Sequence, residues 1–254
     1  MKNIHIPTQS LKKFIGNSFV LLNLLLLVAC SQGIRMKNLV NYPIQLSTLD
    51  ALDTLGVPPD IVKYSGSDVT SFRDIPRSIR IQGRHELRPL WSGDDRGCFQ
   101  VDQDAQVYIS DFNFQGTGGD TALIRVSSGS LILENCDFKP SDFWAIQVDS
   151  GAILELRNVN FSAQSAGAIH MRGGQVKIFD SFFEQIGKTA VYASGGDLFE
   201  LHKSILRNTM GSALEINSVA EVWLDSARII DSFQDGIAIS GCDYVLISQV
   251  ESRE

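Results

Sequence analysis

From about residue 97 onward, apolar and polar positions recur along the chain with a period of 22 to 24 residues. One column of this repeat holds a large apolar residue in every period, at Phe114, Phe138, Phe161, Phe183, Leu206 and Ile229. Ahead of it, an apolar pair brackets a single residue, as in Leu131/Leu133, and a second such pair recurs in each period, as in Ile169/Met171. This alternation is typical of short strands with one buried face. Gly, Ser, Asp and Asn fill the gaps between the strands, which indicates turns.

The repeat predicts an all-β fold in which successive periods stack on one another. Two or three strands per period, no intervening helices and apolar columns in phase are typical of a parallel β-helix. Leucine-rich repeats would need a signature that is absent, and propeller blades would need about 40 residues. We therefore predict a parallel β-helix of about seven coils over residues 78–254, with SIRI at 78–81 as a weak first coil.

A second column, directly ahead of the large apolar one, is rich in Asn and Asp. It consists of Asp111, Asn135, Asn158, Asp180, Lys203 and Ser226. These side chains could form an internal hydrogen-bonded ladder at a turn, or they could bind a ligand. We favour the structural role, because Asn and Asp are turn residues.

The repeat unit also resembles a known family. It reads as an apolar pair, then Asn or Asp, then Phe, then a loop and a strand of the form G/A-I-x-I. Instances are LILENCDF followed by WAIQV, LELRNVNF followed by GAIHM, and LDSARIIDSFQDGIAI. This pattern resembles the repeats of right-handed parallel β-helices of the pectate-lyase-like superfamily. The resemblance implies a right-handed β-helix whose second strand and preceding loops form a polysaccharide cleft, but it is specific for fold and weak for chemistry.

The N-terminus predicts export. Three lysines precede the apolar run Phe14–Ala29, which is too short for a confident membrane span and reads as a signal peptide over residues 1–29. It ends in Leu27-Val28-Ala29-Cys30, which resembles a bacterial lipobox, so Cys30 is the expected lipidation site. In that class Ser31 allows transfer to the outer membrane, and we expect an outer membrane lipoprotein. An ordinary signal peptide or an uncleaved anchor is the alternative.

Removing residues 1–29 takes away three lysines and no acid, so the formal net charge changes from −7 to −10. A body this acidic argues against binding of nucleic acid, anionic lipid or unaided polyuronates. Neutral glycans, envelope proteins or a calcium bridge remain open as partners.

The two ends of the predicted β-helix differ. We assign residues 30–46 to a tether and residues 47–77 to an N-terminal cap, in which STLDALDTL forms a short helix that begins at Ser47 and ends at Gly56. The stretch after Ile247 offers no comparable cap. We therefore hypothesise end-to-end self-association through the last coil, with a charged stop or a truncated reading frame as alternatives.

The residue between each apolar pair should point outward. On the second strand these residues form the column Gln100, Arg125, Gln147, His170, Tyr192 and Glu215, followed by Ala238. Coils about 4.8 Å apart make the first six span roughly 24 Å, close to a short oligosaccharide. Two residues earlier lies a column of mostly small residues that would form a shallow trough beside it: Cys98, Leu123, Ala145, Ala168, Ala190, Ala213 and Gly236.

The six residues of the column from Gln100 to Glu215 are the candidates for ligand binding, although a mixed polar column is also what plain solvation of a sheet face produces by default. The competing surface is the outward column of the other strand, at Tyr108, Ile132, Glu155, Lys177, Glu200, Trp223 and Leu246.

Catalysis has weaker support. In the resembling family, lyases need carboxylates that hold Ca²⁺ beside a basic residue, and hydrolases need two separated carboxylates. Candidate acids are Asp94, Asp95, Asp120, Asp142, Glu215 and Asp235, with Arg125 or His170 as partner. The segment QDGIAI at 234–239 resembles the aspartate-bearing coil of polygalacturonases, but their paired Asp, Gly-His-Gly and Arg-x-Lys motifs are missing, and the loops are short.

Cysteine usage adds little chemistry. Cys98, Cys136 and Cys242 are an odd number without zinc-type spacing, so we expect small buried hydrophobes and no metal site.

We predict a lipid-anchored protein without a cofactor that recognises a glycan or envelope partner, or serves as a rigid spacer. The alternative is a polysaccharide lyase, hydrolase or epimerase, for which Ca²⁺ would be the cofactor.

Overall fold

The computed structural model describes residues 44–46, 62–64, 68–69, 73–75, 78–116 and 122–253. All regular elements in these ranges are strands, and in them no helix is long and apolar enough to cross a membrane. The lipobox with Cys30, the helix expected at 47–56 and the acid candidate Asp120 lie outside the described residues.

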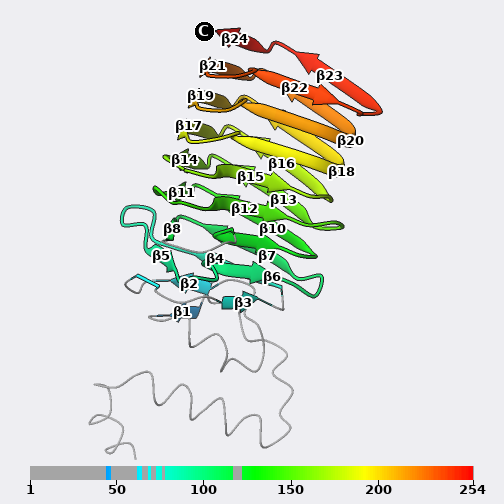
Figure 1. The fold of residues 1–254 in the computed structure, drawn as a ribbon. Helices are drawn as coiled ribbons and strands as arrows, with labels where there is room; N and C mark the ends of the chain where they lie inside the picture. Colours follow the sequence, from blue (N-terminus) through cyan, green and yellow to red (C-terminus); the bar gives the residue numbers. More distant parts are fainter. Residues whose placement is uncertain are drawn as a thin grey trace, which may run out of the picture. The chain divides into compact units, whose positions relative to one another are not determined.

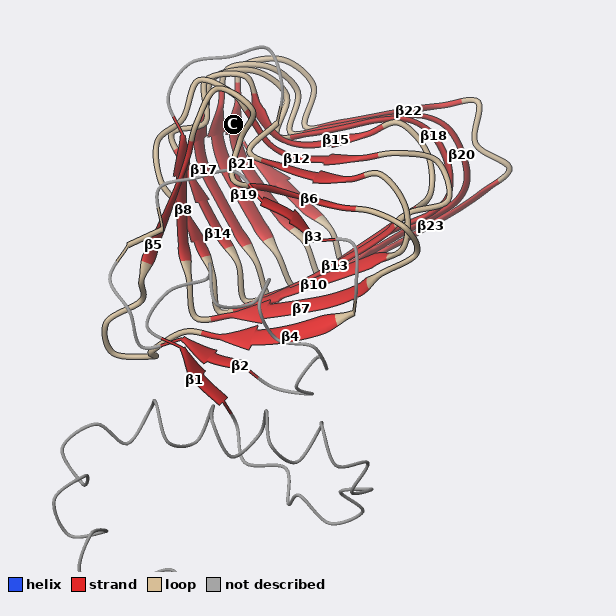
Figure 2. Ribbon diagram, turned by 90° about the horizontal axis from the view of Figure 1, so that it is seen from below, coloured by secondary structure: helices blue, strands red, loops and turns tan. Residues whose placement is uncertain are grey.

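The strands form two parallel sheets, of 16 and 8 strands, that wrap around one core (Figures 1 and 2). The larger sheet covers two faces of the stack, joined by the long strands β18 and β20, and the smaller sheet forms the third face. Face 1 contains β3 (Arg73–Ile75), β6 (Phe99–Val101), β9 (Ile124–Val126), β12 (Trp144–Val148), β15 (Gly167–Met171), the first parts of β18 (Val191–His202) and β20 (Leu214–Asp225), and β22 (Ile237–Ser240).

Face 2 contains β1 (Ile44–Leu46), β2 (Val62–Tyr64), β4 (Ile79–Gln82), β7 (Gln106–Ser110), β10 (Ser130–Glu134), β13 (Ile153–Arg157), β16 (Gln175–Phe179), the last parts of β18 and β20, and β23 (Tyr244–Ser248). Face 3 contains β5 (Leu90–Gly93), β8 (Asn113–Gly116), β11 (Asp137–Phe138), β14 (Asn160–Ser162), β17 (Phe182–Ile186), β19 (Ile205–Thr209), β21 (Arg228–Ser232) and β24 (Glu251–Arg253). Eight strands on face 3 correspond to about eight turns, one more than the sequence predicted.

The core is built from the apolar columns that the repeat predicts. Residues of the large apolar column pair in register from coil to coil and are fully buried. The rings of Phe138 and Phe161 stack with centroids 4.6 Å apart, and those of Phe161 and Phe183 with centroids 4.7 Å apart. This confirms the parallel β-helix, because only in-register stacking places like residues on like.

The column of Asn and Asp forms the corner between faces 2 and 3. Its residues all have positive φ, from 45° at Lys203 to 62° at Asp111. Asn and Asp tolerate this left-handed backbone better than most residues, which explains their recurrence. A rung of the predicted ladder forms where the Asn158 side-chain amide donates to Asn135 at 2.7 Å, but this bond is exposed and not internal.

The sheets begin earlier than residue 78. β2 pairs with β4, β1 pairs with β2, and β3 pairs with β6, all in parallel. Strand pairing therefore extends into the stretches that the sequence assigned to a tether and a cap. The repeat could not indicate this, because these three strands lie outside its period.

The last coil is more exposed than those before it. Val245 and Ile247 pair with Val222 and Leu224 and occupy the same inward positions. They are 41% and 51% exposed, against 0% and 1% for their partners. No described strand covers this edge of the stack.

Candidate functional site

The outward column predicted on the second strand of the repeat lies on face 1. Parallel pairing places its members side by side from coil to coil, in the order Gln100, Arg125, Gln147, His170, Tyr192, Glu215 and Ala238. Each is partly or fully exposed, whereas the residues on either side of it are buried in every coil except the last. The position of the column therefore follows from strand alternation, as predicted, while its role is a separate question.

The first half of the column is bonded to its own neighbours. Gln100 donates to Asp102 at 2.9 Å, and Gln147 donates to Asp149 at 2.9 Å. Both Nε and a terminal nitrogen of Arg125 lie 2.8 Å from an oxygen of the same Asp149. These groups are already paired, so this half offers a ligand few free donors.

The second half of the column is aromatic. The ring of His170 lies between two others, with centroids 5.1 Å from Trp144 and 5.4 Å from Tyr192. We name Trp144, His170 and Tyr192 the aromatic ladder. Trp144 lies over Gly167, where an added Cβ would come within 2.3 Å of the indole, so only glycine fits beneath it.

The sequence reasoning missed Trp144, because it lies three residues ahead of the column and outside the alternation. The available signal was the segment DFWAI, in which a tryptophan opens the strand.

The environment of His170 favours its neutral form. Partial burial lowers its pKa, Arg172 lowers it further, and Asp149 acts weakly in the opposite direction. The ladder is therefore an uncharged, polar and aromatic strip at neutral pH.

The prediction of a shallow trough beside the column is wrong. Its small residues, including Ala145, Ala168, Ala190 and Ala213, are fully buried. In β12 and β15 they form two consecutive buried positions with the following isoleucine, which breaks the alternation. Such a break is expected at a corner, where the chain entering from face 3 bends into face 1, and these residues line the inside of that corner.

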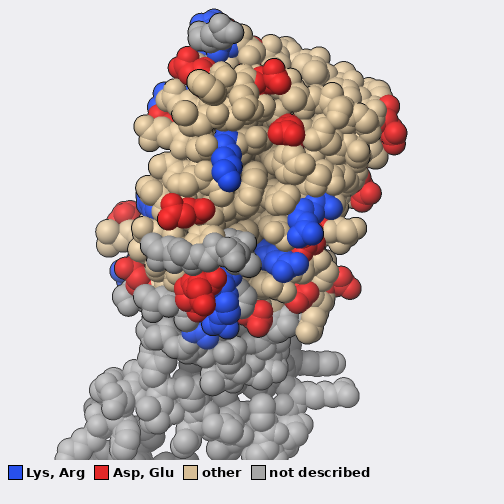
Figure 3. Space-filling view, viewed as in Figure 1, with Lys and Arg blue, Asp and Glu red and all other residues tan. Residues whose placement is uncertain are grey.

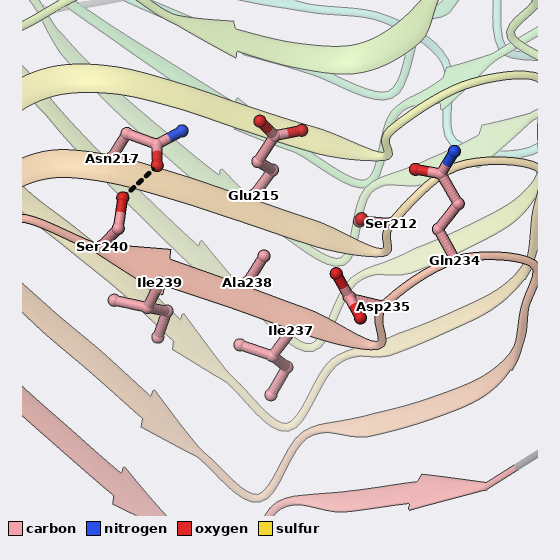
Figure 4. A pocket seen from close by; sticks show the side chains of 9 residues that line it. All are labelled: Ser212, Glu215, Asn217, Gln234, Asp235, Ile237, Ala238, Ile239 and Ser240. Carbon is pink, nitrogen blue, oxygen red and sulfur yellow. Dashed lines mark hydrogen bonds between the residues drawn. The ribbon is translucent and has the colours of Figure 1, made fainter.

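An open concavity of about 560 Å³ adjoins the far end of the ladder. We name it the terminal concavity, and it is lined by Ser212, Glu215, Asn217, Gln234, Asp235, Ile237, Ala238, Ile239 and Ser240. Figure 4 shows Ser212, Glu215, Gln234 and Asp235 on one side of the strands and the two isoleucines on the other. The hollow arises because the column continues from Glu215 to Ala238, whose side chain is small.

The structure brings together only two of the four main catalytic candidates, Glu215 and Asp235, which line the terminal concavity. His170 is separated from Glu215 by the coil of Tyr192, and Arg125 is paired with Asp149. The four candidates therefore do not form one constellation.

The other acid candidates lie elsewhere. Asp94 pairs with Arg96, Asp142 accepts a hydrogen bond from Ser165, and Asp95 is exposed in the turn beside Asp94. Within the described ranges, no three His, Cys, Asp or Glu side chains group as metal ligands.

The competing column on face 2 is occupied by internal interactions. Tyr108 donates to Glu134 at 2.6 Å, and the Arg80 guanidinium lies 4.1 Å from the Tyr108 ring centroid. Glu155 pairs with Arg157, and Glu200 accepts from His202 at 2.7 Å. Trp223, 38% exposed, has a free aromatic surface but no aromatic neighbour on the adjacent coils.

The described cysteines are free thiols. Burial raises the pKa of both Cys98 and Cys136 to about 12, so neither is a nucleophile at neutral pH. This agrees with the expectation of small buried hydrophobes for these two residues, whereas Cys242 is partly exposed.

Charged side chains are sparse on the surface seen in Figure 3, which has the viewpoint of Figure 1 and shows face 1. Basic and acidic groups are scattered among a majority of uncharged residues. Such a surface suits an uncharged or weakly charged ligand better than a polyanion.

The family model described as a right-handed β-helix region matches residues 97–251, more than half of the chain. No curated protein is a significant match.

Proposed function

Because the chain belongs to the right-handed β-helix family, whose fold supplies outward columns and no fixed chemistry, we propose that it is a non-catalytic module that recognises a glycan along face 1. The observation that carries this proposal is the aromatic ladder. Three rings on successive coils, spaced about 5 Å apart, form a strip on which the apolar faces of sugar rings can stack.

Polar groups beside the ladder support the same function. Gln147 lies next to His170 and keeps its side-chain oxygen as an acceptor while its nitrogen donates to Asp149, and Glu215 lies next to Tyr192. Amide and carboxylate groups on either side of aromatic rings match a ligand whose ring faces are apolar and whose edges carry hydroxyls. A rigid spacer would need no such combination on one strip.

The test is a glycan array probed with the full-length chain and two variants, Trp144→Ala and Tyr192→Ala. Loss of one stacking ring should weaken binding by about 1 kcal/mol, roughly fivefold. Trp223→Ala is the matched control, because it removes an exposed tryptophan from face 2. Equal binding by all variants, or no binding to any glycan, would contradict the proposal.

A second function has one observation in its favour. Glu215 and Asp235 line the same concavity, as the two carboxylates of a glycoside hydrolase do. Release of reducing ends from a polysaccharide, abolished in Glu215→Gln, would replace the recognition role with an enzymatic one. Release of unsaturated uronates dependent on Ca²⁺ would instead indicate a lyase.

For location we propose an outer membrane lipoprotein, supported by the lipobox-like Leu27-Val28-Ala29-Cys30. In a diderm bacterium, metabolic labelling with a fatty acid should mark the wild-type protein and leave Cys30→Ala unlabelled. Labelling of both proteins would contradict lipidation at Cys30.

A further inference from the structure

The terminal concavity lies where the aromatic ladder ends. Tyr192 of the ladder pairs with Glu215, and Glu215 pairs with Ala238, so the three residues stand on consecutive coils. A glycan stacked on the ladder would reach the concavity at one coil's distance, about 4.8 Å.

The chemistry of the concavity differs from that of the ladder. Its lining carries two carboxylates, of Glu215 and Asp235, together with amide and hydroxyl groups, and no lysine or arginine. Acceptor oxygens therefore predominate, and the local charge is negative. The carbonyl oxygen of Asn217 is already used, since it accepts from Ser240 at 2.5 Å.

Ser212 provides an independent sign of a ligand. Only 5% of the residue is exposed, at the wall of the concavity, and its hydroxyl has no hydrogen-bond partner among the described residues. Figure 4 shows this oxygen between Glu215 and Asp235, on the side where their carboxylates lie. Because no protein group occupies this hydroxyl and it opens into the concavity, its oxygen is available to a ligand that supplies a donor.

We propose that the terminal concavity binds the cationic amino group of an amino sugar at the end of the recognised glycan. An ammonium group has three donors and no acceptor, and here it meets the oxygens of Glu215, Asp235 and Ser212. The two carboxylates disfavour a uronate at the same place, and the acidic body attracts a cationic ligand over longer range. The inference rests on the glycan binding proposed above.

The test compares two probes that share a backbone, the β-1,4-linked tetramer of glucosamine and the tetramer of N-acetylglucosamine. Calorimetry with the full-length chain at one fixed pH should show tighter binding of the glucosamine tetramer. Glu215→Gln and Asp235→Asn should each reduce this preference about threefold to fivefold, and added salt should reduce it as well.

Glu221→Gln is the matched control, because it removes the same charge from the same strand, β20, but from the part on face 2. It should leave the preference unchanged. Ser212→Ala should weaken binding of the glucosamine tetramer without a change in net charge.

Three results would overturn the inference. Equal binding of both tetramers, weakened by Tyr192→Ala, would leave glycan recognition standing and remove the amino-group site. If Glu221→Gln reduced the preference for the glucosamine tetramer as much as Glu215→Gln does, attraction of the cationic tetramer by the net charge of the protein would explain the preference without a site. Binding of neither tetramer, nor of any other glycan, would remove the proposed function together with the site. Circular dichroism of each variant establishes that the fold is retained.

Discussion

The stacked phenylalanines offer a direct test of how the fold is held together. Phe161 is fully buried and lies between Phe138 and Phe183, with ring centroids 4.6 Å and 4.7 Å away. Phe161→Ala removes the ring from the middle of this stack. The coils above and below are tied by their own strand pairing and cannot collapse into the cavity.

The expected cost follows from complete burial. Truncation of a buried phenylalanine to alanine destabilises proteins by about 3–5 kcal/mol, through lost transfer free energy and the cavity left behind. Because two stacked contacts are lost at once, we expect the upper half of this range.

Phe182→Ala is the matched control, since it makes the same chemical change on the outward side of the neighbouring coil. Phe182 is partly exposed, and the guanidinium of Arg207 lies 4.9 Å from its ring centroid. Its removal should cost about 1 kcal/mol.

Urea unfolding followed by far-ultraviolet circular dichroism measures both variants against the wild type. Stacked repeats can depart from two-state unfolding, so the comparison uses the difference between the two variants. Equal destabilisation by Phe161→Ala and Phe182→Ala would refute the account of the core as a stack of like residues.

Three further predictions concern single groups. Burial and Arg172 lower the pKa of His170 in the folded protein. As the pH falls below about 6.5, this side chain is therefore protonated in the unfolded chain before it is protonated in the folded one. The free energy of unfolding should therefore fall with pH in that range, and less steeply in His170→Asn; identical urea titrations across pH would contradict this. Alkylation of the native protein followed by peptide mapping should modify Cys242 and spare Cys98 and Cys136, and rapid labelling of either buried thiol would count against the core packing. The hypothesis of end-to-end association through the last coil, where Ile247 is exposed, predicts a mass above that of the monomer in light scattering; a strictly monomeric protein at high concentration would exclude it.

The sequence alone determined the repeating part of the fold. A period of 22 to 24 residues with in-phase apolar columns specifies both the strands and their register, because each coil must bury its apolar residues against equivalent residues of the next. The outward column from Gln100 to Glu215 could be predicted for the same reason: alternation along a strand decides which side chains point out.

Only the tertiary structure determined the features that do not follow the repeat period. Trp144 joins the aromatic ladder because Gly167, one coil further on, leaves room for its indole. The small residues that alternation would place outward are buried, because the chain turns a corner there. Glu215 and Asp235 meet at one concavity because Ala238 leaves the space between them. A periodic pattern records what each residue shares with its equivalents on other coils, whereas corners and concavities depend on how unlike residues of neighbouring coils meet, and only the folded stack determines that.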